Sequence, residues 1–160
     1  MIATATLYLE TSVFGFYFDE IPANSQRRQA VVELFEQIGR GLFHAVTSPV
    51  TVDELDRAAT PLRARLLSLL EHVELLETER ASVERLASQY LAEAAIPPHF
   101  ADDARHVAYA TIARCDVLIS LNLKHIASEW IERKINSINL REGYPLLSIR
   151  TPEEVIVYEG

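Results

Sequence analysis

The chain has 160 residues, 49% of them hydrophobic, which predicts one globular domain (residues 1–160) and excludes a disordered or fibrous chain. Its formal net charge of −8 argues against a nonspecific nucleic-acid binder, because contact with phosphate needs Lys and Arg. The single cysteine excludes an internal disulfide and a cysteine zinc site and fits a cytoplasmic protein, for which we expect neither a signal peptide nor a membrane span.

Apolar and amphipathic segments divide the chain into predicted strands and helices. Residues 5–10 are predicted as the first strand, a short apolar run that polar residues stop, and residues 12–18 as a short helix or turn. Residues 26–38 have a helical period, and Ser48 followed by Pro49 is typical of a helix start. The other predicted strands are residues 43–48, 73–77, 116–121 and 145–149, and the other predicted helices are residues 50–59, 62–73, 79–95, 102–115 and 126–135.

Strands alternate with helices along the whole chain. This alternation predicts an α/β fold in which a parallel sheet carries helices on both faces. In such a sheet, ligands bind at the carboxyl ends of the strands, so polar residues at those ends are candidate site residues.

Four oxygen-bearing side chains are predicted to lie at that edge of the sheet. Glu10 ends the first strand, and Asn122 follows the fourth strand. Glu54 lies within the first two turns of the helix after the second strand, and Asp103 lies in the first turn of the helix that leads into the fourth strand. Because Asp103 also borders an apolar helical stripe, its carboxylate is costly to bury unless it is paired or bound to a metal.

Each of these residues alone has an ordinary structural explanation. Glu54 can pair with Arg57 three residues later, and Asp103 can be a charge that meets the helix macrodipole. Together, four oxygen ligands without cysteine indicate a hard divalent cation, Mg²⁺ or Mn²⁺, because Zn²⁺ prefers His or Cys. Asp116 is a further acidic candidate, but its position at the start of a strand predicts the opposite edge of the sheet.

Four segments resemble, in order and spacing, the signature blocks of the PIN-domain family, which includes the endonuclease toxins of bacterial VapBC-type toxin–antitoxin modules. They are LYLETSVFGFY (7–17), TSPVTVDEL (47–55), DDARHVAYA (102–110) and VLISLNLKHI (117–126), and the closing GYPLLSIRTPEEVI resembles the end of one bacterial subgroup. The resemblance covers nearly the whole chain. It implies a three-layer α/β/α sandwich with a central, mostly parallel sheet.

The resemblance also implies a site and an activity. The acidic positions of the family fall on Glu10, Glu54, Asp103 and Asn122, which are then expected to bind Mg²⁺ or Mn²⁺ and to hydrolyse RNA phosphodiester bonds. The family has Asp at the first position and commonly at the fourth, so Glu10 reaches one methylene farther and Asn122 lacks a charge. With three negative charges, we expect one well-held ion, and any second ion to arrive with the substrate phosphate.

Further residues are expected to assist these four. Ser120 matches a hydroxyl position of the family, and Thr11 or Ser12 is expected to hydrogen-bond a metal ligand or the scissile phosphate. Glu54 or Asp103 is the expected acceptor of the proton from the attacking water.

Two groups of side chains near the predicted site have more than one explanation. Basic residues near its mouth are Arg105, His106, Lys124 and His125. They are candidates for contact with substrate phosphates, although an ordinary polar contact is the simpler explanation of each. Aromatic residues after the first strand are Phe14, Phe16, Tyr17 and Phe18. For these we prefer a core or dimer interface to a surface that stacks bases.

Two alternatives to a nuclease stay open. A PIN-like interaction module with weakened metal binding is favoured by Glu10 and Asn122. A receiver-like or phosphatase-like doubly wound domain is the less favoured alternative, because such a phosphatase needs an Asp nucleophile after the first strand, where this chain has Glu10 followed by Thr11 and Ser12. If the toxin resemblance holds, we expect a homodimer and a small antitoxin, encoded beside the gene, whose tail covers the acidic site.

Overall fold

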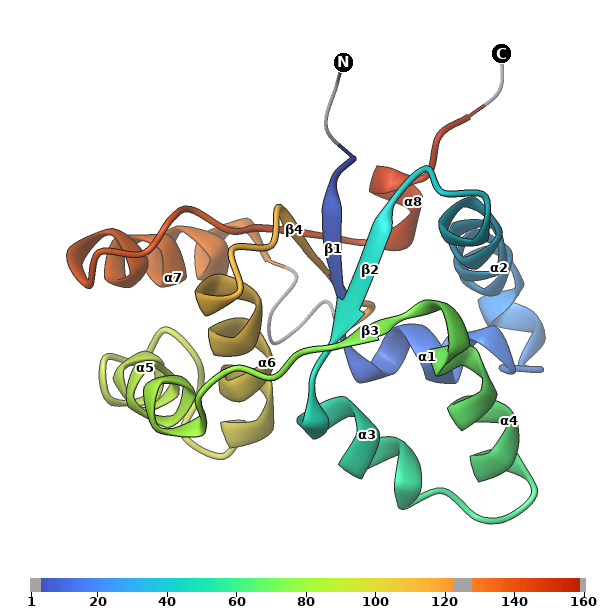
Figure 1. Ribbon diagram of the computed structural model, residues 1–160, viewed down its shortest axis with the longest axis horizontal. Coiled ribbons are helices and arrows are strands. Elements are labelled where there is room, and N and C mark those ends of the chain that lie inside the picture. Colours follow the sequence, from blue (N-terminus) through green and yellow to red (C-terminus); the bar gives the residue numbers. More distant parts are fainter. Residues whose placement is uncertain (1–3, 123–127, 159–160) are drawn as a thin grey trace.

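The computed structural model describes residues 4–122 and 128–158, and five strands in these residues form one sheet (Figure 1). The strands are β1 (Thr6–Leu9), β2 (His44–Thr47), β3 (Glu74–Leu75), β4 (Val117–Ile119) and β5 (Ser148–Arg150). Their order is β3-β2-β1-β4-β5, and every pairing between neighbours is parallel. The predicted parallel sheet is therefore confirmed, with β1 at its centre.

The side chains of β1 alternate between two hydrophobic cores, one on each face of the sheet. Tyr8 is fully buried in one core, and Leu7 and Leu9 are buried in the other. Because successive residues of a strand point to opposite faces, a strand covered on both faces is apolar at every position. The unbroken apolar run of β1 follows from its central place in the sheet.

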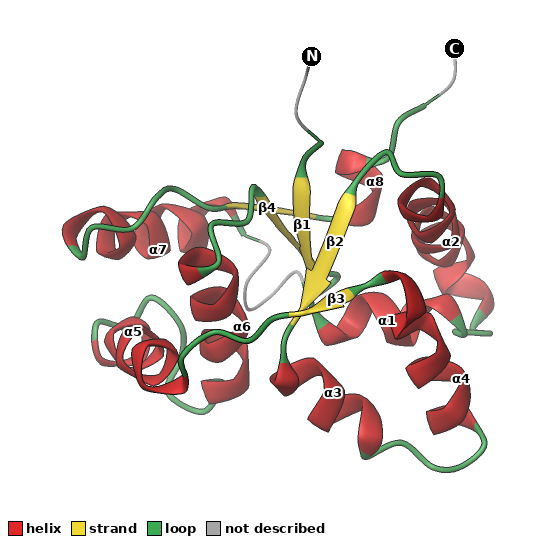
Figure 2. Ribbon diagram, in the orientation of Figure 1, coloured by secondary structure: helices red, strands yellow, loops and turns green. Residues whose placement is uncertain are grey.

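Helices cover both faces of the sheet (Figure 2). Those in the described residues are α1 (Thr11–Tyr17), α2 (Ser25–Gly39), α3 (Pro49–Asp56), α4 (Leu62–Ser68), α5 (Arg80–Ala92), α6 (Ala101–Ile112), α7 (Glu129–Arg141) and α8 (Pro152–Val155). α5, α6 and α7 pack on the face of Tyr8, and α1, α2, α4 and α8 lie on the other face. This is the expected three-layer α/β/α sandwich of PIN-like type. None of the described helices is long and apolar enough to cross a bilayer.

The carboxyl ends of β1 and β2 meet at the edge of the sheet where α1 and α3 begin (Figure 1). α3 contacts α1 and α4 on one side and α6 on the other, so it bridges the two helical layers at this edge. The amino ends of β1 and β2 point toward the opposite edge in Figure 1. The segments that carry the predicted site residues are thus brought to one side of the molecule.

Most predicted elements differ from the observed ones by one to three residues at their ends, and three of the differences are more specific. The helix predicted at residues 62–73 is α4 followed by a 3₁₀ helix, η2 (Leu69–His72). The last strand lies later than predicted, because the side chain of Asn136 hydrogen-bonds both the N–H (2.8 Å) and the carbonyl (2.9 Å) of Leu147. α7 is capped by Ser128 and continues past the predicted end, and the first predicted residues of that helix, 126–127, lie outside the described residues.

Replacing Leu118 by Ala is expected to lower the free energy of unfolding by about 3 kcal/mol. The side chain is fully buried in β4 and packs in the core under α5, α6 and α7, so its truncation leaves a cavity. Leu146→Ala is the matched control, because this leucine is 61% exposed and its truncation is expected to change stability by less than about 0.5 kcal/mol. Urea denaturation followed by circular dichroism measures both variants. Equal losses would contradict the assignment of Leu118 to this core.

Candidate active site

Glu10 directly follows β1 and turns its carboxylate back onto the first turn of α1. Its Oε2 accepts a hydrogen bond from the backbone N–H of Ser12 (2.8 Å), which makes Glu10 the N-cap of α1. Its Oε1 accepts from the hydroxyls of Ser12 (2.6 Å) and Ser120 (2.8 Å). Glu10 is only 5% exposed, and hydrogen bonds to its charged form offset the cost of that burial.

Glu54 enters the same region from α3, whose start is capped by the hydroxyl of Ser48. Its Oε1 accepts hydrogen bonds from the hydroxyl of Thr11 (2.8 Å) and from Nε2 of His106 (2.6 Å). These donors belong to α1 and α6, so Glu54 joins three helices. The alternative of an ion pair with Arg57 is not what holds the carboxylate, although the positive charge of Arg57 adds a smaller effect that lowers the pKa of Glu54.

Asp103 lies half-buried in the first turn of α6. Its Oδ2 accepts a long hydrogen bond (3.4 Å) from the side-chain amide of Asn122. The backbone N–H of Asn122 donates to the hydroxyl of Ser120 (2.9 Å), and that hydroxyl donates to Glu10. One chain of hydrogen bonds therefore joins Glu10, Ser120, Asn122 and Asp103.

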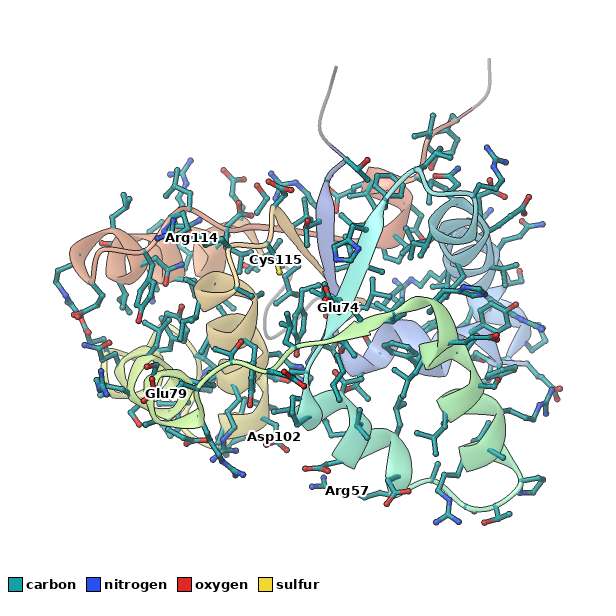
Figure 3. The ribbon with its side chains drawn as sticks, viewed as in Figure 1. Arg57, Glu74, Glu79, Asp102, Arg114 and Cys115 are labelled. Atoms are coloured by element: carbon teal, nitrogen blue, oxygen red, sulfur yellow. The ribbon has the colours of Figure 1, made fainter. Side chains whose placement is uncertain are left out.

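The direction of α6 explains why its first turn reaches this site. Figure 3 shows Asp102 at the end of α6 that lies toward α3, and Arg114 and Cys115 at the far end of the helix. Asp103 follows Asp102 in the first turn, and His106 lies one turn further on the same helix face. The structure thus brings all four predicted positions to one edge of the sheet; their catalytic and metal-binding roles stay predictions.

The electrostatics of Asp103 are those of a carboxylate in negative surroundings. Burial raises its pKa, the charges of Glu10 and Glu54 raise it further, and the net value is about 6 although His106 acts in the opposite direction. Asp103 is therefore close enough to both Glu10 and Glu54 to be repelled by them. The cluster carries more negative charge than its own chain balances.

Glu54 and His106 have the opposite character because they are paired. Burial raises the pKa of Glu54, but its hydrogen bond with His106 and the charge of that imidazole outweigh burial, so the pKa is lowered. Burial lowers the pKa of His106, but the bond to Glu54 and the charges of Glu10 and Glu54 outweigh burial and raise it. The pairing therefore favours ionised Glu54 and a proton on Nε2 of His106.

The donor chemistry of the four predicted positions fits Mg²⁺ or Mn²⁺, because all of them offer oxygen and the described residues include no cysteine near them. Within residues 4–122 and 128–158, however, no group of three or more His, Cys, Asp or Glu side chains is arranged to hold a metal ion. Glu10 and Glu54 are turned onto hydroxyl, amide and imidazole donors, which hold the like charges apart. Coordination by three of them would require the cluster to close around the ion.

Several other predicted residues lie elsewhere or have other partners. Arg105 binds Glu84 and Asp102, each at 2.8 Å, so its contact with substrate phosphate stays a prediction. Asp116 hydrogen-bonds the backbone N–H of Thr6 at the start of β1 and is therefore at the opposite edge of the sheet, as expected.

Of the predicted aromatic group, Phe14 is fully buried and packs edge-on against Phe35, which confirms the core interpretation for this residue. Phe16, Tyr17 and Phe18 are partly buried against the same core. Lys124 and His125 lie outside the described residues.

Sequence reasoning named His106 as a candidate for phosphate contact but missed its burial and its pairing with Glu54. The residue is fully buried, and its Nδ1 lies 2.7 Å from the phenol oxygen of Tyr8. A signal was present, because His106 is three residues after Asp103 in a predicted helix and therefore shares its face. Tyr8 could have been found by strand alternation, since it must point away from the face of Leu7 and Leu9.

Comparisons with protein-family models and with curated proteins find no match. Among solved structures, the chain is similar to one chain in the crystal structure of VapBC2 from Rickettsia felis bound to a DNA fragment from their promoter, with a TM-score of 0.60 and 12% sequence identity. The match covers 91% of this chain and 98% of that chain. At this identity the likeness establishes a shared fold, and function has to be argued from the site.

Asp103→Asn is expected to raise the free energy of unfolding at about pH 7.5 by about 1 kcal/mol in metal-free protein. The native pKa of about 6 exceeds the ordinary value of 3.8, so the native state binds more protons than the unfolded state between these values. Stability therefore falls as pH rises through this window, and the Asn variant lacks that loss. Because Asp103 is only half-buried, solvent screens its charge, and the expected gain in the free energy of unfolding is smaller than the difference in pKa alone would give.

Urea denaturation in EDTA, repeated between about pH 4 and about pH 7.5, measures this effect. Asp102→Asn is the control, because Asp102 neighbours Asp103 in sequence but is paired with Arg105. We expect no gain in stability for the control. A gain of equal size in both variants, or none in Asp103→Asn, would contradict the negative surroundings described for Asp103.

Proposed function

We propose that this chain is a metal-dependent endoribonuclease that uses Mg²⁺ or Mn²⁺ and is the toxin of a type II toxin–antitoxin pair. The observation that carries the proposal is the cluster of Glu10, Glu54 and Asp103 at the carboxyl edge of a parallel sheet. In this cluster, burial and the neighbouring carboxylates raise the pKa of Asp103 to about 6. Negative charge that the chain leaves unbalanced at the ends of parallel strands suits a divalent cation.

The ion is assigned to Glu10, Glu54, Asp103 and Asn122. When bound, it would lower the pKa of a coordinated water and stabilise the charge that develops on the phosphoryl oxygens. The hydroxyls of Thr11 and Ser12 already donate to Glu54 and Glu10, so their role is to orient these two carboxylates.

A carboxylate accepts the proton of the attacking water in this proposal, and Glu54 and Asp103 are the two candidates. Both hydrogen bonds of Glu54 described above fall on Oε1, and the single bond of Asp103 falls on Oδ2. Each carboxylate therefore has a second oxygen that these bonds leave available. Deprotonating a water and coordinating an ion both need such an oxygen.

The substrate and the partners rest on the resemblance to PIN-domain toxins and on the fold shared with a chain of VapBC2. RNA is the proposed substrate, a homodimer the proposed assembly, a small antitoxin the proposed partner, and the cytoplasm the proposed location. Light scattering on the purified chain tests the assembly, and the gene neighbourhood tests the partner. A monomer, or the lack of a small neighbouring reading frame, counts against these proposals without touching the nuclease.

A second candidate is an interaction module that has the PIN-like fold and binds metal weakly. It is favoured by Glu10, whose carboxylate already accepts three hydrogen bonds from its own chain, and by the uncharged Asn122. Such a module would keep the fold and the partner surface and would lack metal-dependent cleavage.

Asp103→Asn is expected to lower the rate of RNA cleavage in Mn²⁺ by about 100-fold or more, because it removes a charged oxygen ligand and one candidate proton acceptor. Asp102→Asn is the matched control and is expected to retain cleavage, since Asp102 is engaged by Arg105. A fluorogenic RNA assay with excess metal measures both. Cleavage that survives in Asp103→Asn, or that persists in EDTA, would contradict the proposed mechanism.

Mn²⁺ is expected to raise the melting temperature of the wild-type chain and much less that of Asp103→Asn. A ligand that binds the native state at 100 times its dissociation constant stabilises by about 2.7 kcal/mol. Differential scanning fluorimetry over a Mn²⁺ series measures the shift. No shift and no cleavage in the wild type would favour the interaction module.

A further inference from the structure

His106 is a buried titratable side chain that the proposed mechanism does not use. The residue is 0% exposed although it lies beside three carboxylates. Both ring nitrogens have partners, Oε1 of Glu54 on Nε2 (2.6 Å) and the phenol oxygen of Tyr8 on Nδ1 (2.7 Å). A buried imidazole with both nitrogens engaged is fixed in position and orientation.

The hydrogen bonds continue from Tyr8 and return to the helix that carries Glu54. The phenol oxygen of Tyr8 lies 2.7 Å from the hydroxyl oxygen of Ser48, which also accepts from the backbone N–H of Val50 (3.2 Å) and caps α3. Glu54 lies on that same helix. The chain Glu54–His106–Tyr8–Ser48 therefore starts and ends on α3 and passes through α6 and β1.

In the tautomer of His106 that carries its proton on Nε2, the donors in this chain all point one way. The N–H of Val50 donates to Ser48, the hydroxyl of Ser48 donates to Tyr8, and the phenol of Tyr8 donates to Nδ1 of His106. Nε2–H then donates to Glu54, which as a carboxylate only accepts. Every donor has an acceptor, as buried polar groups require.

The result for Glu54 is an asymmetry between its two oxygens. Oε1 accepts from both His106 and Thr11, and neither of these bonds involves Oε2. Oε1 is therefore held by the protein, and Oε2 is the oxygen left for a cation. Without His106, the carboxylate would keep one tether and could turn.

We propose that His106 is a positioning residue, which holds Oε1 of Glu54 through the buried chain from Ser48 and Tyr8 so that Oε2 is presented for coordination of a divalent cation. The inference rests on the proposed function, because it concerns the same acidic cluster. It assigns His106 no contact with RNA and no proton transfer.

Two substitutions of His106 separate this role from simple packing. His106→Gln can place an amide N–H where Nε2 lies and so keep a donor to Glu54, whereas His106→Asn reaches only the position of Nδ1 and loses that donor. We expect His106→Asn to bind Mn²⁺ about 10- to 100-fold more weakly than wild type in isothermal titration calorimetry, and His106→Gln to recover most of that loss. In RNA cleavage, the Asn variant should need more Mn²⁺ for half-maximal rate and recover much of the rate at saturating Mn²⁺.

A second pair of variants keeps the inference testable if the His106 variants do not fold. Tyr8→Phe removes the phenol that holds Nδ1, and Tyr90→Phe removes an equally buried phenol that binds Asn139 in the core. Both should lower the melting temperature. Only Tyr8→Phe should weaken Mn²⁺ binding, by several-fold.

Histidine ¹⁵N spectra of the protein in EDTA give a readout without metal or RNA. We expect a slowly exchanging Nε2–H on His106 that is lost in Glu54→Ala. The positioning role is overturned if His106→Asn and His106→Gln bind Mn²⁺ equally well, or if Tyr8→Phe and Tyr90→Phe do. Metal-dependent cleavage by the wild-type protein would still uphold the proposed function. A rapidly exchanging Nε2–H overturns the contact itself. If the wild-type protein shows the protected proton and yet neither binds Mn²⁺ nor cleaves RNA, that result overturns the proposed function and confirms only the contact between His106 and Glu54.

Discussion

Repulsion among three carboxylates at one edge of the sheet is the constraint around which the local structure is organised. Glu10, Glu54 and Asp103 come from separate segments and meet where β1 ends and α3 and α6 begin. Each negative charge is met differently. Glu10 accepts hydrogen bonds from two serine hydroxyls and a backbone N–H. Glu54 accepts from Thr11 and His106. Asp103 has one long hydrogen bond and a raised pKa. The charge left unbalanced therefore rests on Asp103.

The same hydrogen bonds that manage these charges also hold the fold together at this edge. Ser12 donates to Glu10 and accepts from the backbone N–H of Leu121, so the start of α1 is tied to the chain just after β4. Tyr8 links β1 to Ser48 at the start of α3 and to His106 in α6. Side chains of the site are thus also caps and cross-links of the secondary structure, and rigid elements of this kind position functional groups well.

Glu10 has a structural role as well as a place in the acidic cluster. Its carboxylate folds back onto the N–H and hydroxyl of Ser12, where it serves as the cap of its own helix. A charged cap at a helix start is favourable in itself, because it meets the macrodipole and an unpaired N–H. The residue therefore has a structural role in addition to the negative charge that it places beside Asp103.

The sequence by itself determined the alternation of strands and helices, the parallel sheet and the four positions at its edge, because periodicity and strand-end polarity are local properties of the chain. It also placed Asp116 correctly at the far edge. The tertiary structure alone decided which donors hold each carboxylate. An ion pair with Arg57 was the ordinary alternative for Glu54, but its carboxylate pairs with His106 from α6. Asn136 of α7 hydrogen-bonds Leu147, and the last strand begins after it. Such contacts join residues far apart in the chain. A local pattern can place His106 on the helix face of Asp103, but which donor meets which carboxylate is decided only when the layers pack.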